Sequence, residues 1–161
     1  MNPTDLETLR ACYVGSRQPL YTYAVSITGN REAAEDAIHG VFARLLQHDA
    51  LPADPRPYVF RAVRNAALDA GRRARTRRDS LFVAAAEPRA RDPAPALRRD
   101  EVEHFLRALP PDERETIVLK IYGGLTFQEI ADVREVPLPT VASWYRRGLD
   151  QLRTLLAAES R

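Results

Sequence analysis

Residues 109–152 constrain the fold of this chain most, because residues that stop or turn a helix divide the stretch into three helical segments. The breaks fall at Pro110-Pro111, at Gly123-Gly124 and at Pro137-Leu138-Pro139. Short helices joined by tight turns are typical of a helix-turn-helix, whose last helix usually lies in the major groove of DNA. The spacing therefore predicts a helical DNA-binding unit in the C-terminal third of the chain.

Each of these helices has a start that the sequence indicates. Pro111 fits a first helical turn, because the N–H that it lacks would have no partner there. Thr126 and Glu129 have the spacing of a capping box, which predicts a short second helix. Pro139 is expected to open the last helix, which we predict to run through Arg153.

The last helix combines an apolar stripe with a polar face. The apolar residues that recur close to helical spacing are Val141, Tyr145, Leu149, Leu152 and Leu156. Polar side chains on the other face can reach phosphates and base edges, and arginine is a common partner of guanine. With the threonine that precedes the second helix, the candidate duplex-DNA contacts are Thr126, Thr140, Ser143, Arg146 and Arg147. A four-helix domain with a solvated polar face and no ligand is the alternative.

The middle of the chain separates two regions of different composition. Residues 87–99 have few large apolar groups and contain three prolines. Such a segment buries too little apolar surface to offset the entropy lost on ordering. We therefore expect an all-α protein of two small helical domains, residues 1–80 and 100–161, joined by a flexible linker at residues 81–99.

Several common kinds of site find no support in the sequence. Cys12 is the single cysteine, which excludes an internal disulfide and offers no metal cluster. His39, His48 and His104 have no partners at catalytic or metal-ligating spacing. No apolar run reaches membrane-spanning length, and the N-terminus lacks the pattern of a secretion signal. We therefore expect a cytoplasmic, non-enzymatic protein without metal, cofactor or membrane insertion.

Apolar periodicity predicts four helices in the N-terminal half. The first contains Leu6, Leu9 and Tyr13, and the second contains Leu20, Tyr23, Ala24 and Ile27 before a stop at Gly29. The third begins after the N-cap Asn30 and carries Ala34, Ile38, Val41, Phe42 and Leu45 on its apolar face. The fourth follows a loop with three prolines and runs from about residue 58 to residue 75.

The fourth helix carries most of a strongly basic stretch. Residues 56–78 contain eight arginines and a single acid, Asp69, whereas the whole chain has a net charge of only +2. Such a positive island is typical of a phosphate-binding surface. Solvated helix ends give the same pattern and are the alternative.

Helical spacing sorts the fourth helix into two faces. The apolar residues expected in the core are Val59, Val63, Ala66 and Ala70. The opposite face carries Tyr58, Arg61, Asn65, Asp69 and Arg72, with Arg64 beside them. An aromatic ring among guanidinium groups suits unpaired nucleic acid, because bases stack on rings while cations follow the backbone. A polar outer face with an incidental tyrosine is the alternative interpretation.

The order of these parts resembles the extracytoplasmic-function sigma factors, the short two-domain members of the sigma-70 family of bacterial transcription initiation factors. Residues 20–24, 28–37 and 41–45 are similar to the polymerase-binding region of that family. Residues 58–69 and the following Arg72-Arg73 are similar to its promoter-melting helix. Residues 108–115, 124–131 and 140–149 resemble the domain that reads the upstream promoter element.

The resemblance implies partners and a role for each part. The third helix would bind core RNA polymerase through Glu35, Asp36, Ile38, Val41 and Phe42. The fourth helix and the loop before it would hold the single-stranded −10 element with a flipped base, through Tyr58, Arg61, Arg64, Asn65, Arg72, Arg73 and Arg75. The last helix would bind duplex promoter DNA at −35. Many such factors are held inactive by an anti-sigma protein, which would be a further partner.

The sequence departs from the family pattern at two places. His39-Gly40 replaces the usual glutamine and acid in the third helix, and an interior glycine costs a helix about 1 kcal/mol relative to alanine. In the last helix, Pro137, Ala142 and Trp144 stand where a serine cap, a basic residue and an arginine are usual. Trp144 lies at the edge of the apolar stripe, so core packing competes with DNA contact or partner docking.

Two other functions fit the same sequence features. One is a helix-turn-helix regulator that binds duplex operator without core polymerase. The other is a degenerate helical adaptor that binds polymerase or an anti-sigma protein without reading DNA. The basic stretch argues against the adaptor, and the resemblance to a strand-melting helix argues against the regulator.

Overall fold

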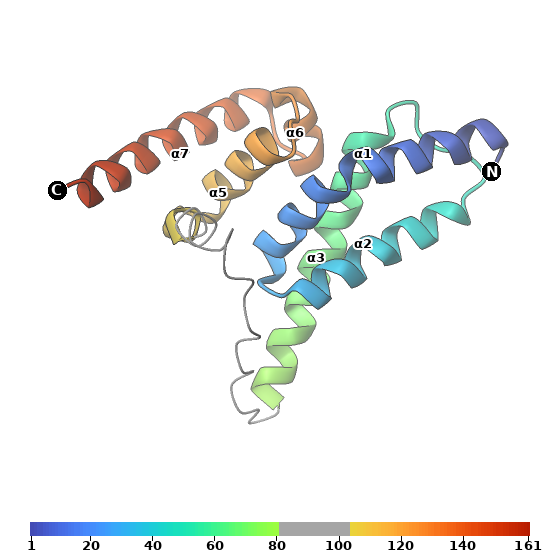
Figure 1. Ribbon diagram of the computed structural model, residues 1–161, viewed down its shortest axis with the longest axis horizontal. Coiled ribbons are helices and arrows are strands. Elements are labelled where there is room, and N and C mark those ends of the chain that lie inside the picture. Colours follow the sequence, from blue (N-terminus) through green and yellow to red (C-terminus); the bar gives the residue numbers. More distant parts are fainter. Residues whose placement is uncertain (81–103) are drawn as a thin grey trace.

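The computed structural model describes residues 1–80 and 104–161, except for the side chains of residues 74–80. All regular structure in the described residues is helical, which confirms the predicted all-α class (Figure 1). The expected linker at residues 81–99 and the side chain of the candidate Arg75 lie outside this description. Within the described ranges, no helix has both the length and the apolarity needed to span a membrane.

The N-terminal half is a bundle of three helices, α1 (Pro3–Thr28), α2 (Arg31–Leu46) and α3 (Pro55–Ser80). The turn between α1 and α2 forms as the sequence predicts. Gly29 ends α1 with a φ of 66°, a left-handed conformation that glycine adopts without steric cost. The Asn30 side chain then accepts a hydrogen bond from the Ala33 N–H at 3.1 Å and caps α2.

The first pair of predicted helices is a single helix, α1, so the prediction of two helices is wrong there. Pro19 lies inside α1. A proline at this place removes one backbone hydrogen bond and crowds the carbonyl four residues earlier, which belongs to Gly15. The helix continues because Leu9 before the proline, and Leu20 and Tyr23 after it, are buried in one core.

Helix α3 extends beyond both predicted ends, and its buried face is rotated from the predicted one. Val59 and Val63 are buried as expected, but Phe60 and Ala67 are buried as well. Ala66 and Ala70, expected in the core, are only half-buried. The rotation follows from the packing of α3 against the C-terminal half in addition to α1 and α2.

The C-terminal half contains α5 (Pro111–Ile117), the short π-helix η1 (Val118–Tyr122), α6 (Phe127–Arg134) and α7 (Leu138–Glu159). The predicted capping box is confirmed, with Glu129 N–H donating to the Thr126 hydroxyl at 3.1 Å and the Thr126 N–H donating to the Glu129 carboxylate at 3.0 Å. Gly124 has a φ of 64° in the turn before α6. The predicted helix-turn-helix of α6 and α7 therefore forms, although α7 is longer than expected.

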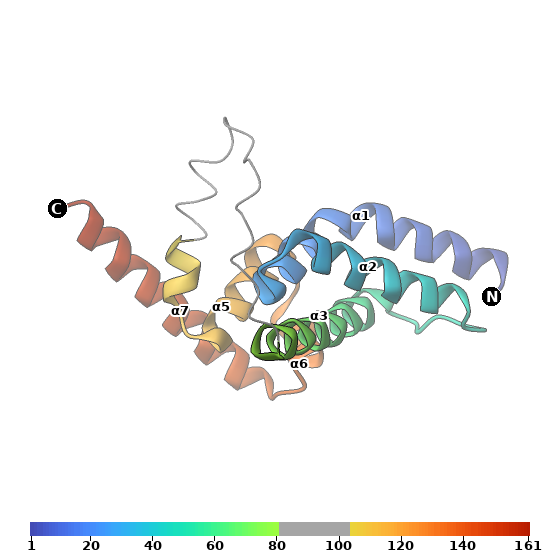
Figure 2. The same ribbon diagram turned by 90° about the horizontal axis from the view of Figure 1, so that it is seen from below.

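The two halves pack directly on each other. Helix α6 lies against α3, and η1 lies against α1 (Figures 1 and 2). One continuous cluster of buried side chains includes Phe60 and Val63 from the N-terminal half together with Leu119 and Leu125 from the C-terminal half. This packing decides which faces of α3 remain open.

Candidate nucleic-acid interface

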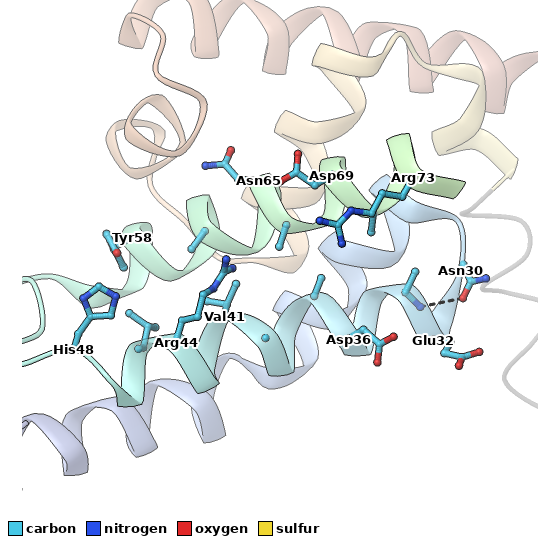
Figure 3. A pocket seen from close by; sticks show the side chains of 17 residues that line it. Asn30, Glu32, Asp36, Val41, Arg44, His48, Tyr58, Asn65, Asp69 and Arg73 are labelled. Atoms are coloured by element: carbon cyan, nitrogen blue, oxygen red, sulfur yellow. Dashed lines mark hydrogen bonds between the residues drawn. The ribbon is translucent and has the colours of Figure 1, made fainter. Parts of the chain in front are cut away.

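The outer residues of α3 divide between two surfaces. Tyr58, Asn65, Asp69 and Arg73 line an open groove of about 1020 Å³ between α2 and α3 (Figure 3). Arg61 and Arg64 lie on another side of the helix and contact the C-terminal half. The face predicted from helical spacing is thus shared between an open groove and an interface.

The groove combines aromatic, amide and charged groups from both helices. In Figure 3, Tyr58 and His48 lie at one end, and Asn30 and Glu32 lie at the other. Arg44 of α2 extends toward α3 in the same view, although nothing in the sequence singled it out. A ring and cations in an open groove are the elements that hold a single nucleic-acid strand.

Arg64 is engaged in a part-buried ion pair with the C-terminal half. Its Nε donates to Glu115 Oε1 at 2.8 Å, and the Arg64 side chain is 21% exposed. Burial lowers the pKa of the Arg64 guanidinium, but the hydrogen bond and the negative charge of Glu115 raise it more. Arg61 makes a longer contact, 3.4 Å from its Nη1 to Glu135 Oε1.

Glu115 receives hydrogen bonds or ion pairs from three side chains. Besides Arg64, the Tyr23 hydroxyl donates to Oε1 at 2.6 Å, and Arg134 Nη1 lies 3.3 Å from Oε2. Burial and the adjacent Glu115 carboxylate raise the pKa of the Tyr23 hydroxyl well above its ordinary value. Tyr23 therefore remains a proton donor to Glu115 at neutral pH.

The candidate polymerase contacts on α2 differ in exposure. Glu35 and Asp36 are exposed, and Asp36 borders the groove. Ile38, Val41 and Phe42 are buried in the bundle, because α2 turns its apolar face toward α1 and α3. These three residues support the helix from inside. Val41 also borders the groove between α2 and α3, and Phe42 borders a smaller hollow between α1 and α2.

The two residues of α2 that depart from the family pattern are both on the surface. His39 and Gly40 are exposed. A Cβ added at Gly40 would meet nothing within 4 Å, so packing does not require glycine there. The departure therefore changes the outer surface of α2 and leaves its core unaltered.

The candidate DNA contacts on the helix-turn-helix also differ in their exposure and in their partners within the chain. Arg146 is exposed and Ser143 half-buried, and both lie on the side of α7 opposite the buried Val141. Thr140 is half-buried, and Thr126 is exposed but uses its hydroxyl to cap α6. In contrast, Arg147 places its Nε 3.4 Å from Glu113 Oε1.

Trp144 packs against a buried charge. Its ring lies over the Arg134 guanidinium, with 4.8 Å between the guanidinium carbon and the ring centroid. Arg134 is 7% exposed and also pairs with Asp112 at 2.6 Å. Trp144 therefore packs at the junction of α6 and α7.

Sequence reasoning missed the residues that join the two halves. Arg56 and Glu115 gave no signal of this role, because their partners are distant along the chain. Arg56 lies 67 residues from Gly123, and Glu115 lies 92 residues from Tyr23 and 51 from Arg64. Gly148 was also missed. It is buried against α5, where an added Cβ would lie 3.0 Å from Ile117 Cγ1. The one local signal for Gly148 was that a residue without a side chain interrupts the large apolar side chains of the stripe.

Comparison with known proteins gives matches to both halves. Residues 13–77 match the model of sigma-70 region 2, and residues 99–152 match that of sigma-70, region 4. The ECF RNA polymerase sigma factor SigE of Mycolicibacterium smegmatis is 32% identical over 150 residues, which cover 88% of this chain and 58% of the relative. The RNA polymerase sigma factor CarQ of Myxococcus xanthus is 35% identical over 106 residues, covering 62% and 59%. The chain thus spans less than 60% of the length of these relatives.

Two solved structures share the fold. The sigma factor RpoE in complex with the anti-sigma factor NepR from Bartonella quintana matches with a TM-score of 0.69 and 19% identity, covering 94% of this chain and 98% of that one. CnrH in complex with the cytosolic domain of CnrY matches with a TM-score of 0.70 and 22% identity, covering 95% and 90%. At these identities the likeness concerns the fold alone.

Proposed function

Since this chain belongs to the extracytoplasmic-function group of the sigma-70 family, we propose that it binds core RNA polymerase and directs promoter-specific initiation of transcription. It does so in the cytoplasm, without chemistry of its own. Residues 1–80 bind polymerase and the −10 element, residues 81–99 connect the domains, and residues 100–161 bind the −35 element. An anti-sigma protein is a further partner.

The observation that carries the proposal is that one chain has two different surfaces, one suited to single-stranded DNA and one suited to duplex DNA. Helix α3 borders an open groove that contains a tyrosine, amides and two arginines beside three carboxylates. Its ring, amides and cations suit an unpaired strand. Helices α6 and α7 form a helix-turn-helix whose first helix begins with a capping box, and this unit suits duplex DNA. A promoter that is opened at −10 and double-stranded at −35 presents both forms of DNA to a single protein.

At −35, the first half of α7 would enter the major groove. Arg146 supplies the exposed guanidinium, which can pair with a guanine edge or a phosphate, and Ser143 lies beside it. Thr140 and Arg147 lie on the flank of the same helix, where phosphate contacts are nearer than base edges. Thr126 would reach the backbone from the start of α6.

At −10, the groove between α2 and α3 would hold the opened strand. Tyr58 offers a stacking surface, Asn65 offers an amide for a base edge, and Arg73 offers a cation for the backbone. Arg61, Arg64, Arg72 and Arg75 extend the positive charge along α3. On α2, Glu35 and Asp36 are the exposed residues proposed to contact polymerase.

Reconstituted transcription tests this function. The purified chain is added to bacterial core polymerase on DNA upstream of its own gene and on a library of promoter fragments. We expect run-off transcripts only when both proteins are present. If the chain neither binds core polymerase nor directs initiation on any fragment, the function is rejected, and duplex binding without polymerase would favour an ordinary regulator.

A further inference from the structure

A single acid stands among the arginines of α3. Residues 56–78 contain eight arginines, and Asp69 is the one acid among them. The Asp69 side chain is 63% exposed and lines the groove between α2 and α3, together with Asn65 and Arg73 of the same helix (Figure 3). A carboxylate repels phosphate, so Asp69 does not bind the backbone of a strand in this groove. The parts of a strand that a carboxylate can bind are the hydrogen-bond donors of its bases.

We propose that Asp69 selects the base that faces it in the opened −10 strand, by accepting a hydrogen bond from an exocyclic amino group. Cytosine offers such a group at N4, a donor that carboxylates accept in base recognition. Thymine and uracil have an oxygen at this position. Their N3–H lies between two carbonyl oxygens, which repel a carboxylate. This inference rests on the proposed function and adds a base-selective residue to the −10 surface.

The contact that Asp69 makes within α3 leaves its carboxylate available. Arg72 Nη1 lies 3.8 Å from Asp69 Oδ1, which is longer than a hydrogen bond. The two side chains are 75% and 63% exposed, and exposed pairs of this kind stabilise little because water and salt screen them. The Asp69 carboxylate can therefore accept a hydrogen bond from a base while the neighbouring guanidinium groups of Arg72 and Arg73 attract the phosphates.

The opposite wall of the groove has the same sign of charge. Glu32 and Asp36 of α2 line the groove together with Asp69. In Figure 3, these two acids lie toward one end, whereas Arg44 and Tyr58 lie toward the other. Carboxylates from both helices repel a phosphate from the groove more strongly than Asp69 alone. A strand in the groove would therefore keep its phosphates on the arginine side and turn its base edges toward Asp69.

The neighbouring amide of Asn65 does not make this choice of base. Asn65 precedes Asp69 by about one helical turn, and the two side chains lie beside each other in Figure 3. An amide can donate as well as accept a hydrogen bond, so Asn65 fits either pyrimidine. An ionised carboxylate only accepts, so the discrimination depends on Asp69. Asparagine in place of Asp69 should therefore abolish the preference while leaving a polar group of similar size.

Binding of two matched single strands tests the selection. A fluorescent octamer of deoxycytidine and one of deoxyuridine have the same length, charge and ring size, and they differ where cytosine carries an amino group and uracil an oxygen. Each is titrated with the full chain. The unchanged chain should bind the deoxycytidine octamer about threefold to tenfold more tightly, as a single hydrogen bond in an exposed site would give. Asp69→Asn should bind the two octamers with equal affinity.

Two further variants separate base selection from general charge and from stability. Asp69→Glu keeps the carboxylate and should keep the preference for deoxycytidine. Asp150→Asn makes the same change from acid to amide on an exposed part of α7 and should keep the full preference as well. A loss of stability, or a change in net charge, would alter the affinity for both octamers alike. The ratio of the two dissociation constants is therefore the quantity to compare.

An equal ratio in Asp69→Asn and Asp150→Asn would overturn the selection by Asp69. Equal affinity of the unchanged chain for the two octamers, or binding of neither, would overturn it as well. The titrations contain no polymerase, so this failure is distinguishable from failure of the proposed function. Transcripts with core polymerase but no preference between octamers would reject Asp69 alone, whereas a preference without transcripts would reject the proposed function.

Discussion

The two candidate DNA surfaces of this chain differ in how they are engaged within the molecule. On α3, Arg61 and Arg64 are paired with carboxylates from the other half of the chain. On α7, Arg146 extends from the exposed side of the helix and has no ion-pair partner among the described residues. One surface is thus partly occupied by the protein itself, whereas the other is free to meet DNA.

The difference indicates an order of binding. Duplex DNA can reach α7 without any rearrangement, because its exposed side is not part of the contact between the halves. A strand that uses Arg64 must first replace Glu115, so the free energy of that ion pair reduces the affinity of the strand. Each tenfold reduction corresponds to about 1.4 kcal/mol. The −35 surface should therefore act before the −10 surface.

The largest expected effect concerns the support of α7. Gly148→Leu would force a side chain against Ile117, which already lies 3.0 Å from an added Cβ. Overpacking of this kind should lower the free energy of unfolding by about 3 kcal/mol, measured by urea denaturation. Gly40→Ala is the control, because nothing lies within 4 Å of its Cβ. Equal stability of the two variants would show that α7 is not seated on α5 through Gly148.

The next largest effect concerns DNA binding by the first half of α7. Arg146→Ala should weaken binding of polymerase holoenzyme to a −35 duplex by about 2 kcal/mol, because a bidentate or phosphate contact is lost. Arg153→Ala lies two turns later on α7, in an exposed pair with Asp150, and should change affinity little. Filter binding or fluorescence anisotropy measures both. An equal loss in the two variants would mean that general charge, rather than the first half of α7, binds the duplex.

A smaller effect concerns the occupied surface. Tyr23→Phe removes the hydroxyl that donates to Glu115 at 2.6 Å and should lower the free energy of unfolding by about 1 kcal/mol at neutral pH. The folded state raises the pKa of Tyr23, so it binds the proton more tightly than the unfolded chain does. The stabilising contribution is therefore complete below pH about 10 and declines as pH rises further.

Denaturation of the unchanged chain and of Tyr23→Phe between pH 8 and pH 11 tests whether the contribution of Tyr23 declines as pH rises. The stability difference between the unchanged chain and Tyr23→Phe should narrow above pH about 10. A difference that stays constant or grows would contradict the hydrogen bond from Tyr23 to Glu115.

The smallest effect tests the position of Trp144. Trp144→Leu loses the ring over Arg134 and should lower the free energy of unfolding by about 0.5 kcal/mol. Duplex binding should stay the same, because the ring contacts a residue of its own chain. Tyr145→Leu removes a comparable ring contact with Phe127, at 5.2 Å between centroids, and is the matched control. A selective loss of DNA affinity in Trp144→Leu would make Trp144 a DNA contact.

Local signals in the sequence correctly predicted the turn between α1 and α2 and the start of α6, whereas α3 and α7 extend beyond their predicted ends. Gly29, Asn30 and the Thr126–Glu129 capping box act within one turn, so their effect depends little on the rest of the fold. The helix-turn-helix followed from the same kind of signal. Apolar periodicity divided α1 into two helices, but α1 continues through Pro19 because burial of Leu20 and Tyr23 outweighs the local penalty of a proline.

Contacts between distant residues could not be predicted in this way. Phe60 and Ala67 are buried because α3 packs on helices from both halves, which periodicity along one helix does not reveal. Nothing near Glu115 in the sequence indicates its role. Its partners Tyr23 and Arg64 lie on α1 and α3, so its role depends on how the halves meet.

Promoter opening measured by permanganate reactivity tests the central claim most directly. Thymines in the −10 region of a responsive promoter should become reactive only when core polymerase and this chain are both present. Protection or unchanged reactivity with both proteins present, on a promoter that the complex binds, would contradict a role in strand opening. Reactivity produced by polymerase alone would contradict it equally.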